Sequence, residues 1–114
     1  MSKGRTSEIK INVELDVNSV PERILWTATE GAQSEECKAV VLSVWDGKTA
    51  NTLRIDLWNK DMQVDEMKYF VHQTILTLAD SFEKATGEDK MAMTMRDFCD
   101  YFAEKMGLKG QGQN

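Results

Sequence analysis

The chain has 114 residues, 41% of them apolar and 29% charged, and a formal net charge of −5. This length suits one packed domain, because single domains usually hold roughly 100–150 residues. The acidic balance argues against nucleic acid as the main partner, since binding to a phosphate backbone is mostly an effect of basic surface. No apolar run reaches the roughly 20 residues that a bilayer crossing needs, and no secretory signal opens the chain. We therefore expect a cytoplasmic protein without a transmembrane segment.

The first predicted element is a strand over residues 7–17. Its apolar side chains alternate with polar ones, which is the period of a strand with one face buried: Ile9, Ile11, Val13, Leu15 and Val17. A turn at residues 18–21 follows, where Asn and Ser favour a reversal and proline removes a backbone donor. Residues 22–29 can then return as a second strand with Ile24, Trp26 and Ala28 in the core. A hairpin is the simplest arrangement.

Residues 34–45 show a helical pattern. Ser34 can cap a helix whose first turn holds Glu35 and Glu36, a favourable place for acidic side chains. Apolar residues then recur at the spacing of a helix stripe: Cys37, Val40, Val41, Val44 and Trp45. The valines would also suit a strand. We predict a helix over this segment.

A turn at residues 46–49 leads to a third strand over residues 52–58. Its apolar residues Leu53, Ile55 and Leu57 again alternate with polar ones. Trp58 falls on the polar side of this strand.

Two helices complete the predicted domain. The first begins after residue 63, and its main apolar stripe would cover one face of the sheet: Val64, Met67, Val71, Ile75, Leu78 and Phe82. Tyr69 and Leu76 lie to one side of this stripe and Phe70 to the other, so this helix should contact two neighbours. One neighbour is the last helix, over residues 88–106, where methionine and phenylalanine repeat at helical spacing.

These elements predict an α+β fold with the order ββαβαα. We expect a single domain over residues 7–106, with a small, mostly antiparallel sheet covered on one face by helices. Residues 1–6 should form a flexible N-terminal tail, and the Gly- and Gln-rich residues 107–114 a disordered one.

No motif in the sequence predicts catalysis, a cofactor or a metal. Residues 47–49 read GKT, but a phosphate-binding loop needs a glycine five positions upstream, where the chain has Leu42. The only histidine, His72, would need a thiol nearby to act as a base, whereas Cys37 and Cys99 lie on apolar stripes and are expected to be free, buried thiols. Carboxylates at helical spacing next to lysine and arginine suit solvated faces. We therefore predict a protein that is not an enzyme.

Trp58 is the residue most suited to recognition. It is large and flat, and it lies on the polar sheet face near Arg54 and Asp56, as an interface anchor with a polar rim would. The alternative is that Trp58 folds over the strand–helix junction as a cover for the core, because the register could slip by one residue. The predicted partner-binding residues are Trp58, Met62, Tyr69 and Leu76.

Four sequence runs resemble one known family. They are spread over residues 7–105: SEIKINVELD (7–16), VLSVWD (41–46), TLRIDLWNKDMQVDEMK (52–68) and TMRDFCDYFAEK (94–105). Together they are similar to the gliding motility protein GldC family of Bacteroidota. The resemblance implies a small cytoplasmic accessory factor of the gliding machinery, a system that overlaps with type IX secretion. It carries no catalytic residues to transfer.

We therefore expect a non-enzymatic interaction protein that supports gliding, with a gliding- or type IX secretion-associated component as its partner. One alternative is a small holdase-like chaperone or a module that binds apolar ligands in a groove between sheet and helix. The edges of the sheet would also allow a homodimer. An enzyme with a site made of scattered carboxylates is the third hypothesis.

Overall fold

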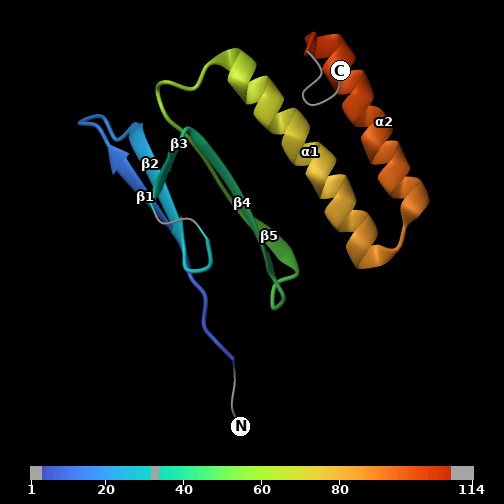
Figure 1. Cartoon of the computed structure of the whole chain (residues 1–114), viewed down its shortest axis with the longest axis horizontal. Helices are drawn as coiled ribbons and strands as arrows, with labels where there is room; N and C mark the ends of the chain where they lie inside the picture. Colours follow the sequence, from blue (N-terminus) through green and yellow to red (C-terminus); the bar gives the residue numbers. More distant parts are fainter. Residues whose placement is uncertain (1–3, 32–33, 109–114) are drawn as a thin grey trace. The chain divides into compact units, whose positions relative to one another are not determined.

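The computed structural model describes residues 4–31 and 34–108 (Figure 1). Five antiparallel strands form two small sheets and two helices follow them, so the α+β class is confirmed. The chain divides into two compact units, residues 1–62 with the strands and residues 63–114 with the helices. Of the two predicted tails, residues 1–3 and 109–114 lie outside the described residues.

The first sheet confirms the predicted N-terminal hairpin, but its first strand ends at Leu15, and Val17, expected on the buried face, lies in the turn and is 99% exposed. Its register places Ile11 opposite Trp26 and Val13 opposite Ile24, so the alternating apolar residues of the two strands share one face. Ile24 also lies opposite Cys37 on the third strand and is fully buried. The three strands lie in the order β1 (Ile9–Leu15), β2 (Pro21–Ala28) and β3 (Glu35–Cys37).

The helix predicted over residues 34–45 is wrong, because this segment forms β3 and then β4 (Ala39–Asp46). β4 pairs with β5 (Asn51–Trp58) as an antiparallel hairpin, which makes up the second sheet. The element order is therefore βββββαα. The error has a physical cause: β4 is apolar on both faces, so it shows no period of two, and its apolar residues fit a helical spacing equally well. Its β-branched valines favour the strand.

A single residue, Lys38, separates β3 from β4, and the chain bends there, so the continuous segment 35–46 contributes to both sheets. The carbonyl oxygen of Lys38 accepts a hydrogen bond from the backbone N–H of Asn59, 2.9 Å away, immediately after β5. The Asn59 side chain is buried, and its Oδ1 accepts the N–H of Asp61 at 3.0 Å. The β4–β5 ladder thus continues to the junction with the first sheet.

Asp16 closes the turn between β1 and β2 and also reaches the end of the second sheet. Its Oδ1 accepts the N–H groups of Asn18 and Val20 at 2.7 and 3.0 Å. Its Oδ2 lies 2.6 Å from Nζ of Lys60, which follows β5 in the chain. The Lys60 ammonium and then the Val20 N–H lower the pKa of Asp16 from 3.8 to about 2. The same contact raises the pKa of Lys60.

The helical unit is a hairpin of two helices close to the predicted bounds, α1 (Val64–Thr86) and α2 (Asp89–Met106). Gly87 ends α1 with φ +76°, a conformation that glycine adopts without a steric cost, and its N–H bonds the carbonyl of Glu83. Ala79, Ala92 and Cys99 are buried in this unit. Small side chains allow the helix backbones to approach closely, and the rings of His72 and Phe102 lie 6.0 Å apart.

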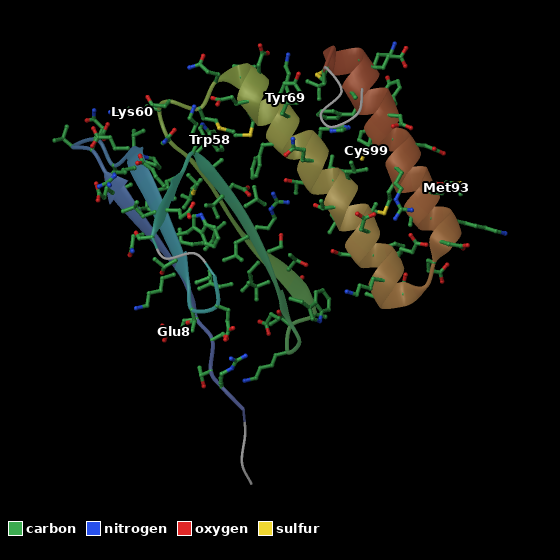
Figure 2. All side chains as sticks on the ribbon, in the orientation of Figure 1. Glu8, Trp58, Lys60, Tyr69, Met93 and Cys99 are labelled. Carbon is green, nitrogen blue, oxygen red and sulfur yellow. The ribbon has the colours of Figure 1, made fainter. Side chains whose placement is uncertain are left out.

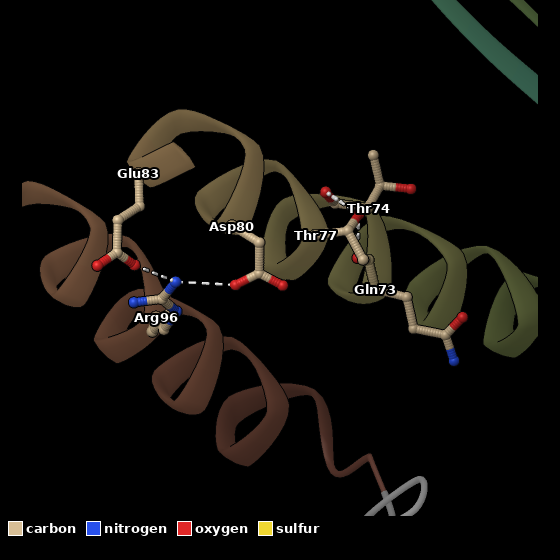
Figure 3. A network of polar contacts seen from close by, with 6 residues as sticks. All are labelled: Gln73, Thr74, Thr77, Asp80, Glu83 and Arg96. Carbon is tan, nitrogen blue, oxygen red and sulfur yellow. Dashed lines mark hydrogen bonds and ion pairs between the residues drawn. The ribbon is translucent and has the colours of Figure 1, made fainter. Parts of the chain in front are cut away.

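Arg96 links the two helices by charge. Its Nη2 lies 2.8 Å from Oδ1 of Asp80 and 2.7 Å from Oε1 of Glu83, so one guanidinium on α2 binds two carboxylates on α1 (Figure 3). These two hydrogen bonds raise the pKa of Arg96. α2 is therefore one neighbour of α1, as predicted. The predicted main stripe of α1 is not fully covered, because Val64 and Leu78 remain exposed.

We expect Asp16→Asn to lower the free energy of unfolding at pH 7, because the amide can still accept turn hydrogen bonds but cannot pair with the Lys60 ammonium. The pKa of Asp16 is lower in the folded state than in the unfolded chain, so its ionised carboxylate stabilises the folded state at pH values above 3.8. This contribution is lost as the pH falls from 3.8 to about 2. The difference between variant and parent should therefore shrink over this interval. Urea denaturation at several pH values measures it.

Glu22→Gln is the matched control, because Glu22 lies 3.7 Å from Lys60 and is more exposed than Asp16. It should change stability less than Asp16→Asn at pH 7. An Asp16→Asn deficit of equal size at pH 7 and pH 2 would show that the ion pair is not its cause.

Candidate protein-interaction surface

The β4–β5 hairpin has two faces, which follow from its register because residues directly opposite each other point to the same side. One face, which we call the tryptophan face, consists of Ala39, Val41, Ser43, Trp45, Thr52, Arg54, Asp56 and Trp58. The other face, which we call the aliphatic face, consists of Val40, Leu42, Val44, Leu53, Ile55 and Leu57, with the pair Asp46 and Asn51 at its turn end.

Two exposed indole rings lie at opposite ends of the tryptophan face. Trp45 is 65% exposed and stands opposite Thr52, near the hairpin turn. Trp58, labelled in Figure 2, is 54% exposed and stands opposite Ala39 in the register. The length of strand from Thr52 to Trp58 sets the two rings about 20 Å apart along the hairpin.

A charged pair lies between the two tryptophans. Nη2 of Arg54 is 2.9 Å from Oδ1 of Asp56 on the same strand, and both side chains are about half exposed. Aromatic side chains and arginine are the residue types that contribute most binding energy at protein interfaces. The tryptophan face thus combines two apolar anchors with a polar centre, and it can bind a protein surface without chemical change.

The aliphatic face is also open to solvent over most of its length. Four of its side chains are between 40 and 58% exposed: Leu42, Val44, Leu53 and Ile55. Contiguous exposed apolar side chains on a soluble protein indicate an interaction surface. The polar side chains of this face, Asp46 and Asn51, lie at the hairpin turn and hydrogen-bond within it, so the rest of the face offers apolar contact area with little selectivity.

The four predicted partner-binding residues are divided between the two units. Trp58 lies on the same face as Arg54 and Asp56, as the alternation predicts, and it is not buried as a cover for the core. Met62 ends the first unit and is half-buried. Tyr69 and Leu76 lie on one side of α1, about two turns apart; Tyr69 is half-buried and Leu76 is 36% exposed. Their role in partner binding stays a prediction.

Trp45 is the member of this surface that the sequence pattern does not predict. The helical spacing over residues 34–45 places it on an apolar stripe, where a side chain is expected to be buried. The signal that identifies it is the three valines before Trp45 and the Asp-Gly turn after it, which together are typical of a hairpin.

The turn that contains the GKT sequence is occupied by a carboxylate of the chain itself. Asp46 accepts the N–H of Lys48 at Oδ1, 3.0 Å away, and the hydroxyl of Thr49 at Oδ2, 3.1 Å away. The Lys48 N–H and the Thr49 hydroxyl thus serve to close the hairpin. The turn is a structural element of β4–β5.

The thiols are poorly suited to nucleophilic chemistry. Burial is the main reason that the pKa values of Cys37 and Cys99 are raised, which favours the neutral thiol over the reactive thiolate. Among residues 4–31 and 34–108, no three His, Cys, Asp or Glu side chains are grouped as a metal site requires. No helix in the described part of the chain combines the length and apolar character needed to cross a membrane.

A family model for gliding motility-associated GldC-like proteins matches residues 21–108, which is well over half of the chain. The chain belongs to the GldC-like family. The match extends from the start of β2 to the end of α2, so it includes the tryptophan face of this GldC-like chain. Searches among curated proteins and among solved structures gave no match.

Replacing either exposed tryptophan should affect folding less than replacing Trp26, which lies on the apolar face of the first sheet beside the core residue Ile24. We expect Trp26→Ala to cost roughly 3–5 kcal/mol. Trp45→Ala and Trp58→Ala should each cost less than about 2 kcal/mol, because exposed side chains lose little contact on truncation. Urea denaturation of the three variants tests the ranking, and a loss at Trp58 as large as that at Trp26 would make Trp58 a core residue.

Proposed function

We propose that this protein is a non-enzymatic cytoplasmic accessory protein that supports the gliding machinery through protein–protein contacts, and that the tryptophan face of β4–β5 is the contact surface. Its partner is a component associated with gliding or with type IX secretion. Membership of the GldC-like family supports the link to gliding. The exposed pair Trp45 and Trp58 is the observation that carries the choice of surface.

The geometry of the tryptophan face supports binding to a structured partner. Two indole rings about 20 Å apart can each enter an apolar pocket, and together they fix the orientation of the bound surface. Arg54 and Asp56 between them already satisfy each other at 2.9 Å, so their burial in a complex leaves neither charge unpaired. A buried charge without a partner would weaken the complex by several kcal/mol.

In-cell crosslinking of the tagged full-length protein in a gliding bacterium tests this proposal. Trp58→Ala and Trp45→Ala are compared with the parent protein after their stabilities have been matched, and the captured proteins are identified by mass spectrometry. We expect one stoichiometric motility- or envelope-associated protein, captured by the parent and at least tenfold less by either variant. Strains that carry the same variants should glide more slowly, in line with the loss of partner capture.

Tyr101→Ala is the matched control, because Tyr101 is an aromatic residue with nearly the same exposure as Trp58 but lies on α2 in the other unit. It should leave both capture and gliding unchanged. Capture of the same partner at equal yield by all three variants would exclude the tryptophan face as the contact surface.

The aliphatic face favours a second function, that of a small holdase-like chaperone or a module that binds apolar ligands. Its exposed leucine, isoleucine and valine side chains offer non-directional contacts that suit unfolded clients. In this case many unrelated proteins would be captured, and the protein would suppress aggregation of an unfolded client in vitro. Leu53→Thr with Ile55→Thr should abolish that suppression, whereas Trp58→Ala should not.

A further inference from the structure

The outer edge of β1 is the part of this fold that suits contact with a second copy of the chain. β1 is the end strand of the first sheet, and among the described strands it pairs with β2 alone. The carbonyl of Glu8 accepts the N–H of Thr29, and the N–H of Glu8 donates to the Thr29 hydroxyl, so the backbone groups of Glu8 point towards β2. Since these groups alternate in direction along a strand, those of Ile9, Ile11 and Val13 point away from the sheet.

The two edges of this sheet differ in how they are protected against pairing with another chain. β3, the opposite edge strand, has three residues, and two of them are the exposed Glu35 and Glu36. Short length and charge are two devices by which proteins protect a sheet edge. β1 has seven residues, contains no proline, and is irregular only at Glu14/Leu15. Its edge is therefore a template for a further strand.

We propose that β1 pairs with β1 of a second copy of this chain, antiparallel and about a two-fold axis at Asn12. In this register Lys10 stands opposite Glu14 of the second copy, and the two-fold axis repeats the pair. On the other face Ile11 meets Val13, and Ile9 meets Leu15. The two three-stranded sheets become one continuous sheet with the order β3-β2-β1-β1-β2-β3.

The spacing of an antiparallel ladder suits these charge pairs. The backbone groups of Lys10 and Glu14 point to β2, so in the new pairing these residues occupy non-hydrogen-bonded sites, where Cα atoms lie about 4.5 Å apart and side chains approach most closely. Opposite charges at such sites stabilise a strand pair, and like charges destabilise it.

Both charges are accessible for this contact. Lys10 has Glu8 as its neighbour at 3.8 Å, with both side chains about two-thirds exposed. Glu14 contacts Arg23 of β2 at 3.4 Å, and both of these side chains are about half exposed. The apolar ends of β1 are open as well, since Ile9 is 74% and Leu15 54% exposed. Pairing would cover them.

The charge pattern also selects one register. Moving the axis to Ile11 would place Glu8 opposite Glu14, so two acidic side chains would face each other. Moving it to Val13 would pair Lys10 with Asp16, whose carboxylate is already bound by Lys60 and by the turn. The axis at Asn12 pairs Lys10 with Glu14 twice within the strand and leaves both contacts in place. Just beyond the strand it brings Glu8 opposite Asp16, whose carboxylate is already neutralised by Lys60.

β5 is the other strand with a charge pattern that could pair with its own copy. An axis at Ile55 would place Arg54 opposite Asp56. However, these two side chains already bind each other at 2.9 Å within one strand, so a new pairing would replace an ion pair that exists. Pairing through β1 is therefore expected to stabilise a dimer more than pairing through β5.

Charge reversal tests the pairing on the full-length protein, with sedimentation equilibrium and light scattering as readouts. Lys10→Glu and Glu14→Lys each place like charges opposite each other twice in a homodimer, and each should raise the dimer dissociation constant at least tenfold. A mixture of the two variants places opposite charges at both sites, so it should form a heterodimer with nearly the parent affinity. A monomeric parent at millimolar concentration, or a dimer that Lys10→Glu does not weaken, would overturn the proposal.

Amide hydrogen exchange on the unmodified protein gives a test that needs no variant, in case the loss of the Glu14–Arg23 contact impairs folding. The N–H groups of Ile9, Ile11 and Val13 should exchange at least tenfold more slowly at high protein concentration than at low. Concentration-dependent protection at Arg54 and Asp56 without protection at β1 would assign the dimer to β5 and refute the pairing proposed here.

The dimer does not rest on the proposed function. β1 lies outside the segment that the family model matches, and the tryptophan face lies on the other sheet. Trp58→Ala should therefore leave the dissociation constant of the dimer unchanged, and Lys10→Glu should leave the exposure of both tryptophans unchanged. Each proposal can fail without the other.

Discussion

The strand unit depends on one continuous segment, residues 35–46, which bends at Lys38 and belongs to both of its sheets. Lys38 separates β3 from β4, and its carbonyl holds the N–H of Asn59 at the end of β5. The Asp16–Lys60 ion pair connects the β1–β2 turn to the segment that follows β5. Because a backbone hydrogen bond and an ion pair both fix this junction, the β4–β5 hairpin is anchored to the first sheet at its open end.

This construction leaves the β4–β5 hairpin with apolar side chains on both faces. A two-stranded hairpin is at best marginally stable alone in water, and it gains stability from contacts with other surfaces. The first sheet buries Ile24, whereas Trp45, Trp58 and Leu53 on the hairpin stay more than half exposed. The strand order thus leaves apolar surface available for a partner. The two faces of the hairpin differ in selectivity, because the Arg54–Asp56 ion pair lies on the tryptophan face.

The sequence predicts an element well where one of its faces is polar and fails where neither is. Ile11 and Val13 alternate with polar residues, so the pattern alone assigns the apolar face of β1, and the register with β2 agrees. β4 instead begins with an uninterrupted apolar run over residues 39–42, so periodicity cannot separate strand from helix there. For the same reason the sequence identifies only half of the candidate surface, because Trp58 lies on an alternating strand and Trp45 does not.

The two surfaces proposed for binding lie on different sheets, which has a consequence for affinity. Pairing through the edge of β1 uses backbone groups of Ile9, Ile11 and Val13, and it does not occupy the faces of the β4–β5 hairpin. A dimer would therefore present two tryptophan faces at once. When two linked sites engage one assembly, the second contact forms at a high effective concentration, so overall binding can exceed that of a single site by orders of magnitude. A repeated partner in a motility assembly would then be held firmly by faces that bind weakly one at a time.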